Sequence, residues 1–237
     1  MERVLVYGEH SGVFEQQLKK FNIDVVDEDP DVVVAIGGDG TFLESEMFYP
    51  GIPKILIKHA YDCNQCDKHD YSKLIKKFLE GKYTIISQLK LEAVVNGNEK
   101  KKLVALNDVN IHYTPPRALR VEVSVNNKVV APLVIGDGVV VATPYGSTGY
   151  FNSITKKKFK KGIGLAFNNP TKDIKHLILN DEAVIKVKIL RGEGVVVVDC
   201  DDDGIDIKEG DEVVVRKSLS EANIVQLKGF NLKITKY

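Results

Sequence analysis

The run Asp-Val-Val-Val-Ala-Ile at residues 31–36 constrains the fold more than any other stretch of the chain. Residues 32–36 are too uniformly apolar for a strand with one face in water, so we expect a central strand that is covered on both faces. Apolar spacing predicts strands at residues 3–7, 23–26 and 53–58 and helices at residues 12–21 and 71–79 around it. The sequence therefore predicts an α/β domain over residues 1–88, with residues 83–89 leading out of it.

The buried strand ends in Gly37-Gly38-Asp39-Gly40-Thr41, and a helical pattern follows from residue 41 to residue 48. Ligands of α/β sheets bind beyond the carboxyl ends of the strands, which is where this loop falls. Glycines let bare N–H groups approach an anion, and the dipole of the next helix favours negative charge. We therefore expect Gly37, Gly38, Gly40 and Thr41 to bind phosphate. A tight turn with a capping aspartate is the alternative.

Asp39 is the only acid in this glycine loop. A carboxylate beside phosphate is repelled unless it holds a metal ion or accepts a proton from an attacking hydroxyl. We therefore expect Asp39 to be catalytic, and the loop to serve phosphoryl transfer. The loop has neither the lysine of a Walker A motif nor the Gly-x-Gly-x-x-Gly spacing of a dinucleotide fold.

From about residue 90 the pattern changes to short strands separated by turns. The dipeptides Asn96-Gly97 and Asn126-Asn127 between apolar alternations favour hairpins. We expect a mostly antiparallel, β-sandwich-like domain over residues 89–237, and leave open a return of roughly the last 15 residues to the first domain. Its strands are expected at residues 91–95, 104–111, 119–125, 129–135, 138–142, 183–190, 194–198 and 212–215.

Two polar segments interrupt these strands. Asn107 and Asp108 are adjacent within the strand expected at residues 104–111, so at least one should face inwards or lie on a bulge. Gly136-Asp137-Gly138 precedes an apolar strand and then Thr143-Pro144-Tyr145-Gly146-Ser147-Thr148-Gly149-Tyr150. Hydroxyls, an aromatic face and permissive glycines suit a nucleoside. A turn-forming Asn-Asp pair and a plain connector are the alternatives.

Together these motifs resemble those of the NAD kinases. The Gly-Gly-Asp-Gly-Thr loop alone is shared with diacylglycerol and sphingosine kinases and, less closely, with phosphofructokinases. NAD kinases add an Asn-Glu pair, an Asp-Gly and a Thr-Pro-Thr-Gly-Ser-Thr-Ala-Tyr segment in this order. Here Asp108 stands for the glutamate, Tyr145 for a threonine and Gly149 for the alanine. The late Asp-Gly and Gly-Asp of the family resemble Asp203-Gly204 and Gly210-Asp211, so the resemblance covers about residues 32–215.

The resemblance implies transfer of a phosphate from ATP, or from polyphosphate, to the 2′-hydroxyl of the adenosine ribose of NAD. By match, Asp39 would be the base or the carboxylate that meets Mg²⁺, or another divalent cation, through the phosphate. The NAD-binding residues implied by match are Asn107, Asp108, Asp137, Thr148, Gly149, Tyr150 and Ser153. Homo-oligomers are usual in such a family. A non-catalytic nucleotide-binding homologue and a lipid kinase are the competing hypotheses.

Two segments depart from the family pattern. Residues 58–69 replace a glycine-containing segment, and their His59, Cys63, Cys66 and His69 have the ligand types of a zinc site. A plain polar loop with reduced thiols is the alternative. After Tyr150 the chain has five lysines within residues 156–161 instead of a Gly-Gly-Pro stretch. They would either attract a phosphate donor or form a solvated loop.

The amino-acid composition restricts the classes of molecule that the protein is expected to bind. Lysine plus arginine equals aspartate plus glutamate at 33 each, which gives no general attraction to nucleic acid or to an anionic membrane. No apolar run approaches the length of about 20 residues that spans a bilayer, and no signal peptide precedes the first strand. Three cysteines do not make a secreted disulfide framework. We therefore expect a cytoplasmic protein whose partners are small molecules.

Overall fold

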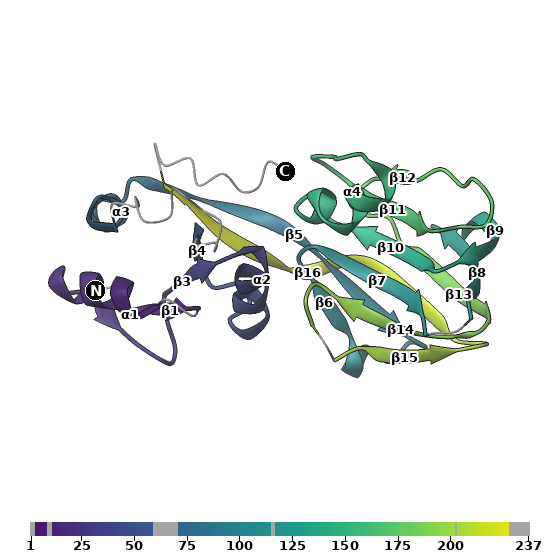
Figure 1. The fold of residues 1–237 in the computed structure, drawn as a ribbon, viewed down its shortest axis with the longest axis horizontal. Coiled ribbons are helices and arrows are strands. Elements are labelled where there is room, and N and C mark those ends of the chain that lie inside the picture. The colour runs from purple at the N-terminus through teal and green to yellow at the C-terminus, as the bar shows by residue number, and fades with distance from the viewer. Residues whose placement is uncertain (1–2, 9–10, 59–70, 115–116, 202, 228–237) are drawn as a thin grey trace. The chain divides into compact units, whose positions relative to one another are not determined.

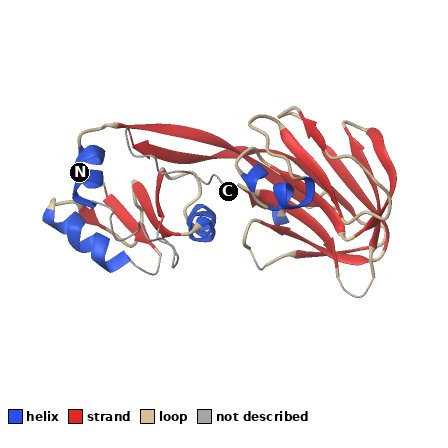
Figure 2. Cartoon of the chain, turned by 45° about the horizontal axis from the view of Figure 1, so that its top comes forward, coloured by secondary structure: helices blue, strands red, loops and turns tan. Residues whose placement is uncertain are grey.

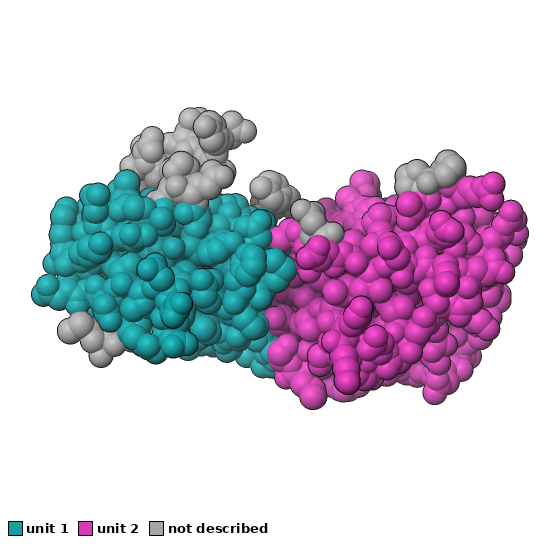
Figure 3. All heavy atoms as spheres, turned by 90° about the horizontal axis from the view of Figure 1, so that it is seen from below, with its two compact units in different colours: residues 1–88, 221–236 teal, residues 89–220, 237 magenta. Residues whose placement is uncertain are grey.

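The computed structural model describes residues 3–8, 11–58, 71–114, 117–201 and 203–227. The chain forms two compact units: residues 1–88 with 221–236, and residues 89–220 with 237 (Figure 3). Two long strands, β5 (Tyr83–Val95) and β16 (Glu212–Leu227), begin in one unit and continue in the other. No helix in the described part of the chain is long and apolar enough to cross a membrane.

The first unit is an α/β domain (Figures 1 and 2). Its parallel strands are hydrogen-bonded in the order β2-β1-β3-β4-β16. Residues 32–36, which form most of the central strand, are all buried, as the sequence predicts. Its elements are β1 (Arg3–Tyr7), α1 (Ser11–Lys20), β2 (Asp24–Val25), β3 (Val32–Gly37), α2 (Asp39–Phe48), β4 (Lys54–Lys58) and α3 (Tyr71–Leu79).

The second unit contains two packed sheets of mostly antiparallel strands. One sheet has the order β16-β13-β8-β9, with β5 beside β16 and β6 beside β5; the other has the order β12-β11-β10-β7-β14-β15. The strands are β6 (Leu103–Ala105), β7 (Asp108–Tyr113), β8 (Leu119–Val125), β9 (Lys128–Gly136), β10 (Gly138–Ala142), β11 (Ile163–Asn168), β12 (Leu177–Leu179), β13 (Ile185–Arg191), β14 (Glu193–Val198) and β15 (Ile205–Lys208). A 3₁₀ turn, η2 (Glu99–Lys101), follows β5, and η3 (Gly146–Thr148) and helix α4 (Tyr150–Thr155) follow β10.

The chain crosses from one sheet to the other at glycine-containing corners, one of which is the turn through Gly210 between β15 and β16. β9 leads into β10 through Asp137, and β13 leads into β14 through Gly192, whose φ is +105°. Inward-facing aliphatic side chains of both sheets form one core, which includes Val121, Val141 and Val187. The expected β-sandwich-like second domain is therefore present, and Asp137 lies at one of its corners.

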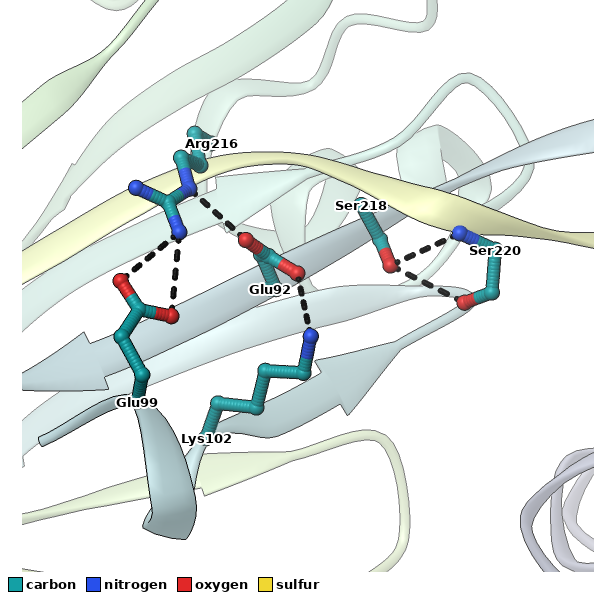
Figure 4. A network of polar contacts seen from close by, with 6 residues as sticks. All are labelled: Glu92, Glu99, Lys102, Arg216, Ser218 and Ser220. Carbon is teal, nitrogen blue, oxygen red and sulfur yellow. Dashed lines mark hydrogen bonds and ion pairs between the residues drawn. The ribbon is translucent and has the colours of Figure 1, made fainter.

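A buried carboxylate links three segments of the second unit (Figure 4). Glu92 on β5 accepts hydrogen bonds from Arg216 Nε at 2.7 Å and from Lys102 Nζ at 3.2 Å. Arg216 also donates to Glu99 at 2.9 Å. Burial alone would raise the pKa of Glu92, but the hydrogen bonds from Arg216 and Lys102 outweigh it and lower the pKa. The carboxylate therefore stays charged and holds β5 to β16.

Several boundaries differ from the sequence predictions. α2 begins at Asp39 rather than at residue 41, so Asp39 and Gly40 form its first turn. Residues 83–95 form one strand, whereas a strand was expected only at residues 91–95, and β16 runs to Leu227 rather than ending at residue 215. The strand expected at residues 104–111 is broken into β6 and β7. No sequence pattern predicted α4, β11, β12 or β15.

Candidate active site

The glycine loop joins β3 to α2. Of its three glycines, the first, Gly37, is the one whose surroundings leave no room for a side chain. Gly37 has a φ of +157°, and a Cβ there would lie 2.3 Å from Thr41 Oγ1. Any side chain at Gly37 would therefore collide with Thr41. This close approach fixes the turn by which the strand enters the helix.

Gly38 and Gly40 are different, because a Cβ at either position would meet no atom of the described residues within 4 Å. Gly38 has a φ of −88°, which other residues adopt readily, and Gly40 lies in the first turn of α2. Glycine is unfavourable inside a helix by about 1 kcal/mol relative to alanine. Two glycines that the fold does not need leave open space at a helix N-terminus, where backbone N–H groups and the dipole favour anions.

Asp39 lies between these two glycines and is the acid of the first turn of α2. Gly38 is the N-cap residue of this helix, and as a glycine it has no side chain with which to cap the helix. Thr41, in turn, is half-buried against Gly37. The structure therefore puts Gly38, Asp39 and Gly40 together at the carboxyl end of the central strand.

A buried ion pair fixes the other end of α2. Lys54 Nζ lies 2.7 Å from Glu46 Oε2, and both side chains are almost completely buried. The same ammonium group donates to the carbonyl oxygens of Tyr49 and Ile52, and Gly51 donates its N–H to Glu46 Oε1. These bonds tie the end of α2 to the start of β4.

In the second unit, Asn107 lies in the bend between β6 and β7, and Asp108 is the first residue of β7. The carboxylate of Asp199 accepts the backbone N–H groups of Leu106 and Asn107, each at 2.7 Å, and that of Asp108 at 3.2 Å. Asp108 itself is buried, with 8% of its surface exposed. Asp199, which the sequence analysis missed, therefore holds the turn from the end of β14.

Asp108 is buried and Asp199 is half-buried, and their carboxylates repel each other. Burial, followed by the charge of Asp199, raises the pKa of Asp108 to about 7. Burial also raises the pKa of Asp199, although its three N–H donors favour the charged form. The proton held by this pair therefore belongs on Asp108, and Asp108 is a hydrogen-bond donor below about pH 7.

The segment after β10 packs against this turn. Thr143 donates its hydroxyl to the carbonyl oxygen of Leu106 at 2.5 Å, and Gly146 donates its N–H to Thr143 Oγ1 at 3.0 Å. A Cβ at Gly146 would lie 2.1 Å from the carbonyl oxygen of Asn107. Ser147 is buried and donates to the carbonyl oxygens of Pro144 and Phe159. Thr143, Gly146 and Ser147 are therefore structural, and they bring the following residues close to Asn107.

Tyr150 begins α4 and is 36% exposed. Its hydroxyl accepts a hydrogen bond from Asn168 Nδ2 at 2.6 Å. Burial first, and then the negative charges of Asp137 and Asp108, raise the pKa of Tyr150, while the bond from Asn168 opposes the rise. The Asp137 and Asp108 carboxylates therefore lie close enough to Tyr150 to act electrostatically on its hydroxyl.

A cavity of about 520 Å³ adjoins Tyr150 and Ser153. Asn168 and Asn169 lie on its wall, and Asn169 Nδ2 donates to Asp137 Oδ2 at 3.2 Å. Thr148 is half-exposed and Gly149 is exposed, and a Cβ at Gly149 would lie 3.9 Å from Asn107 Nδ2. The cavity wall therefore includes Tyr150 and Ser153 of the seven residues expected to bind NAD, and it adds Asn168 and Asn169. Asp137 is bonded to this wall through Asn169, and Gly149 lies beside Asn107.

The remaining motifs either do not line this cavity or lie outside the described residues. Asp203-Gly204 and Gly210-Asp211 flank β15, and Asp211 accepts the N–H of Lys208 in the turn before β16. All five lysines of residues 156–161 are exposed, as in a solvated loop. The loop with His59, Cys63, Cys66 and His69 lies outside the described residues. Among the described residues, no group of three His, Cys, Asp or Glu side chains could hold a metal ion.

Comparison with known proteins identifies the family. A family profile described as the ATP-NAD kinase C-terminal domain matches residues 106–227. The NAD kinase of Acetivibrio thermocellus is 30% identical over 227 residues, which cover 89% of this chain and 77% of that protein. The NAD kinase of Methanothermobacter thermautotrophicus is 29% identical over 229 residues, which cover 92% and 80% of the two chains.

Solved structures have the same fold. The yeast NADH kinase complexed with NADH superimposes with a TM-score of 0.81 at 18% identity, covering 98% of this chain and 84% of that one. An NAD kinase from Archaeoglobus fulgidus in complex with ATP gives a TM-score of 0.73 at 22% identity, covering 96% and 94%. The matching profile, the two relatives and the shared fold agree with the motifs in both units: this chain belongs to the NAD kinase family.

Proposed function

We propose that this phosphotransferase moves a phosphate from ATP to the 2′-hydroxyl of the adenosine ribose of NAD and so produces NADP. The observation that carries the proposal is the open space beside Gly38 and Gly40, at a helix N-terminus whose first residue is Asp39. A turn that served the fold alone would need glycine only at Gly37. The absence of a side chain at Gly38 and at Gly40 leaves room for a ligand with phosphate groups.

The chain's own groups have separate parts in this reaction. Gly37, Gly38, Gly40 and Thr41 hold phosphate through backbone N–H groups and the Thr41 hydroxyl. The 2′-oxygen of the ribose forms a bond to the transferred phosphorus, and the bond from that phosphorus to the departing ADP oxygen breaks. An oxygen of the Asp39 carboxylate accepts the proton that the 2′-hydroxyl loses. Because the transition state is loose, positioning and charge neutralisation matter more than covalent chemistry.

A magnesium ion, or another divalent cation, fits this site only in company with the substrate. Mg²⁺ in kinases is commonly held by one or two carboxylates together with substrate phosphates. Asp39 is the one acid of the glycine loop and is half-exposed beside the open space, so it would be the protein ligand. When bound, the ion would neutralise negative charge on the phosphates.

NAD contacts belong to the cluster in the second unit. In this proposal Asn107 and Asp108 bind hydroxyls or the adenine, and Asp137 lies towards the nicotinamide end. Thr148, Gly149, Tyr150 and Ser153 line the adenosine part, where the exposed ring of Tyr150 offers an apolar face. Asp108, protonated below about pH 7, would donate a hydrogen bond to a substrate oxygen.

The direct experiment supplies NAD with Mg²⁺ and either ATP or inorganic polyphosphate, and measures NADP. We expect NADP with ATP as donor. A lipid kinase would instead phosphorylate diacylglycerol or a sphingoid base, and a non-catalytic homologue would bind NAD without making NADP. NADP formation with polyphosphate alone would replace ATP as the donor while leaving the acceptor unchanged.

Self-association is a further part of the proposal. We propose that the chain works as a homo-oligomer, as the family resemblance implies. Sedimentation velocity of the purified protein checks this, and a single species at the mass of one chain, 26.3 kDa, would contradict it.

A further inference from the structure

A second cavity of the second unit, with a volume of about 830 Å³, has a positively charged wall. Arg120 on β8, Arg191 at the end of β13 and Arg117 between β7 and β8 all line it. All three side chains are exposed. Within the described part of the chain, the structure gives none of these guanidinium groups a hydrogen bond or an ion pair. The volume lies in the usual range of small-molecule sites, which is roughly 300–1,000 Å³.

Arg120 and Arg191 are direct cross-strand neighbours. They are register partners in the antiparallel pairing of β8 with β13, strands that lie side by side in Figure 1. A shift of register between Ile189 and Arg191 marks a bulge, and bulges re-aim the side chains beside them. Like charges directly opposite one another destabilise a sheet. The pair therefore lowers stability unless something negative lies between the two side chains.

Nearby charged pairs do not have this conflict. On the same two strands Glu122 is the register partner of Lys188, and on β14 and β15 Glu193 is the partner of Lys208. The other register partner of Arg120, on β9, is the apolar Ile135. Glu209 is the one remaining acid on the cavity wall. The charges of Glu193 and Lys208 cancel, so the remaining charged residues on the cavity wall are three arginines and Glu209.

We propose that this cavity binds a small molecule with a chain of phosphate groups, held by Arg117, Arg120 and Arg191. Guanidinium groups bind phosphate oxygens through paired N–H donors, and several arginines match several phosphates better than one. Inorganic polyphosphate and nucleoside polyphosphates share this chemistry. The site is separate from the glycine loop of the first unit and from the Tyr150 cavity, whose lining residues are different. It does not depend on the proposed kinase reaction.

Calorimetric titration with inorganic tripolyphosphate, without divalent cations, tests the proposal on three proteins. These are the unmodified chain, Arg120→Gln/Arg191→Gln, and the matched control Lys128→Gln/Lys188→Gln, which removes the same charge from exposed positions outside the cavity wall. Binding at the glycine loop is common to all three, so only a difference among them reports on the cavity. We expect the arginine variant to lose about tenfold or more in affinity for one binding event, and the control to change little.

Further measurements keep the result interpretable. Melting curves in low salt should show the arginine variant to be at least as stable as the unmodified chain, because the like-charge pair is gone. Arg120→Lys/Arg191→Lys should bind with intermediate affinity, since it keeps the charge and loses the paired donors. Repeating the titration with ATP distinguishes a nucleotide from an inorganic chain. The proposal would be overturned if all the proteins bound tripolyphosphate with equal affinity. It would also be overturned if Lys128→Gln/Lys188→Gln lost as much affinity as Arg120→Gln/Arg191→Gln.

Discussion

Gly38 and Gly40 differ from Gly37 in what a substitution would do. A Cβ at Gly40 meets no atom of the described residues within 4 Å, and alanine is favoured over glycine in a helix by about 1 kcal/mol. We therefore expect Gly40→Ala to keep or slightly raise the melting temperature while lowering phosphate transfer at least tenfold, since the new methyl group occupies the ligand's space.

Gly37→Ala is the matched comparison for this prediction. Its Cβ would collide with Thr41, so this variant should lose stability as well as activity. Thermal unfolding and an NADP assay on both variants check the contrast. If Gly40→Ala keeps full activity, the loop is only a turn and does not receive phosphate.

Tyr150 makes a second prediction at the scale of one residue. Its ring is partly exposed beside the cavity that also adjoins Ser153, while its hydroxyl bonds to Asn168. Tyr150→Ala should weaken NAD binding, measured calorimetrically, and Tyr150→Phe should weaken it less because the ring remains. Unchanged NAD affinity in Tyr150→Ala would remove this residue from the site.

Asp108 predicts a pH dependence of stability. Its pKa is about 7 in the folded protein and near 3.8 when unfolded, so between these values the folded state binds more protons than the unfolded state. The free energy of unfolding therefore falls as pH rises through this window and levels off above it. Asp199 faces Asp108 directly, Asp137 and Tyr150 lie nearby, and Lys90 acts on Asp199.

Asp108→Asn should remove this fall in the free energy of unfolding, because asparagine resembles the protonated form of aspartate. Relative to the unmodified chain, the variant should gain stability as pH rises from about 5 to about 8. Denaturant unfolding at several pH values measures the difference. A difference between the two proteins that stays constant with pH would show that Asp108 does not titrate in this window.

At the scale of elements, α2 depends on the buried pair at its end. Lys54→Met leaves the Glu46 carboxylate buried without its ammonium partner, and removing one partner of such a pair costs about 3–5 kcal/mol. The double change Glu46→Leu/Lys54→Met should recover part of the loss. Urea unfolding of the three proteins measures this. If the double variant is no more stable than Lys54→Met, the unpaired Glu46 carboxylate is not the cause of the loss.

Elements whose signal is local could be predicted from the sequence. The apolar run at residues 32–36 indicated the buried strand β3, and amphipathic spacing gave α3 at its observed bounds. Asn126 and Asn127 both have positive φ, as a two-residue hairpin between β8 and β9 requires. These features depend on residues that are close together in the sequence, so the sequence pattern alone is enough to predict them.

Elements that depend on distant contacts could not be predicted in this way. The bonds from Asp199 to the Asn107 turn span about 90 residues of sequence, and only an acid directly after the valines of β14 hinted at them. β16 was expected to be short because the polar run Arg216-Lys217-Ser218 hides its alternation. Helix α4 is too short for a periodic pattern.

At the scale of the whole molecule, each unit carries one part of the proposed reaction. The parallel sheet of the first unit presents the glycine loop and Asp39 at the carboxyl end of β3. The sandwich of the second unit presents Tyr150 within electrostatic reach of Asp137 and Asp108. The family shows that such a chain is an NAD kinase, and the residues within each unit give that activity a physical basis.

The most direct test of the account compares the unmodified chain with Asp39→Asn, a change that keeps the shape of the side chain and removes its charge. With ATP, Mg²⁺ and NAD, the unmodified chain should form NADP, and the variant should be slower by about 10² to 10⁴-fold. Its affinity for NAD, measured by calorimetry, should change little, because the NAD contacts are assigned to the second unit. Near-normal NADP formation by Asp39→Asn together with lost NAD binding would contradict the account, since Asp39 would then orient substrate rather than accept its proton.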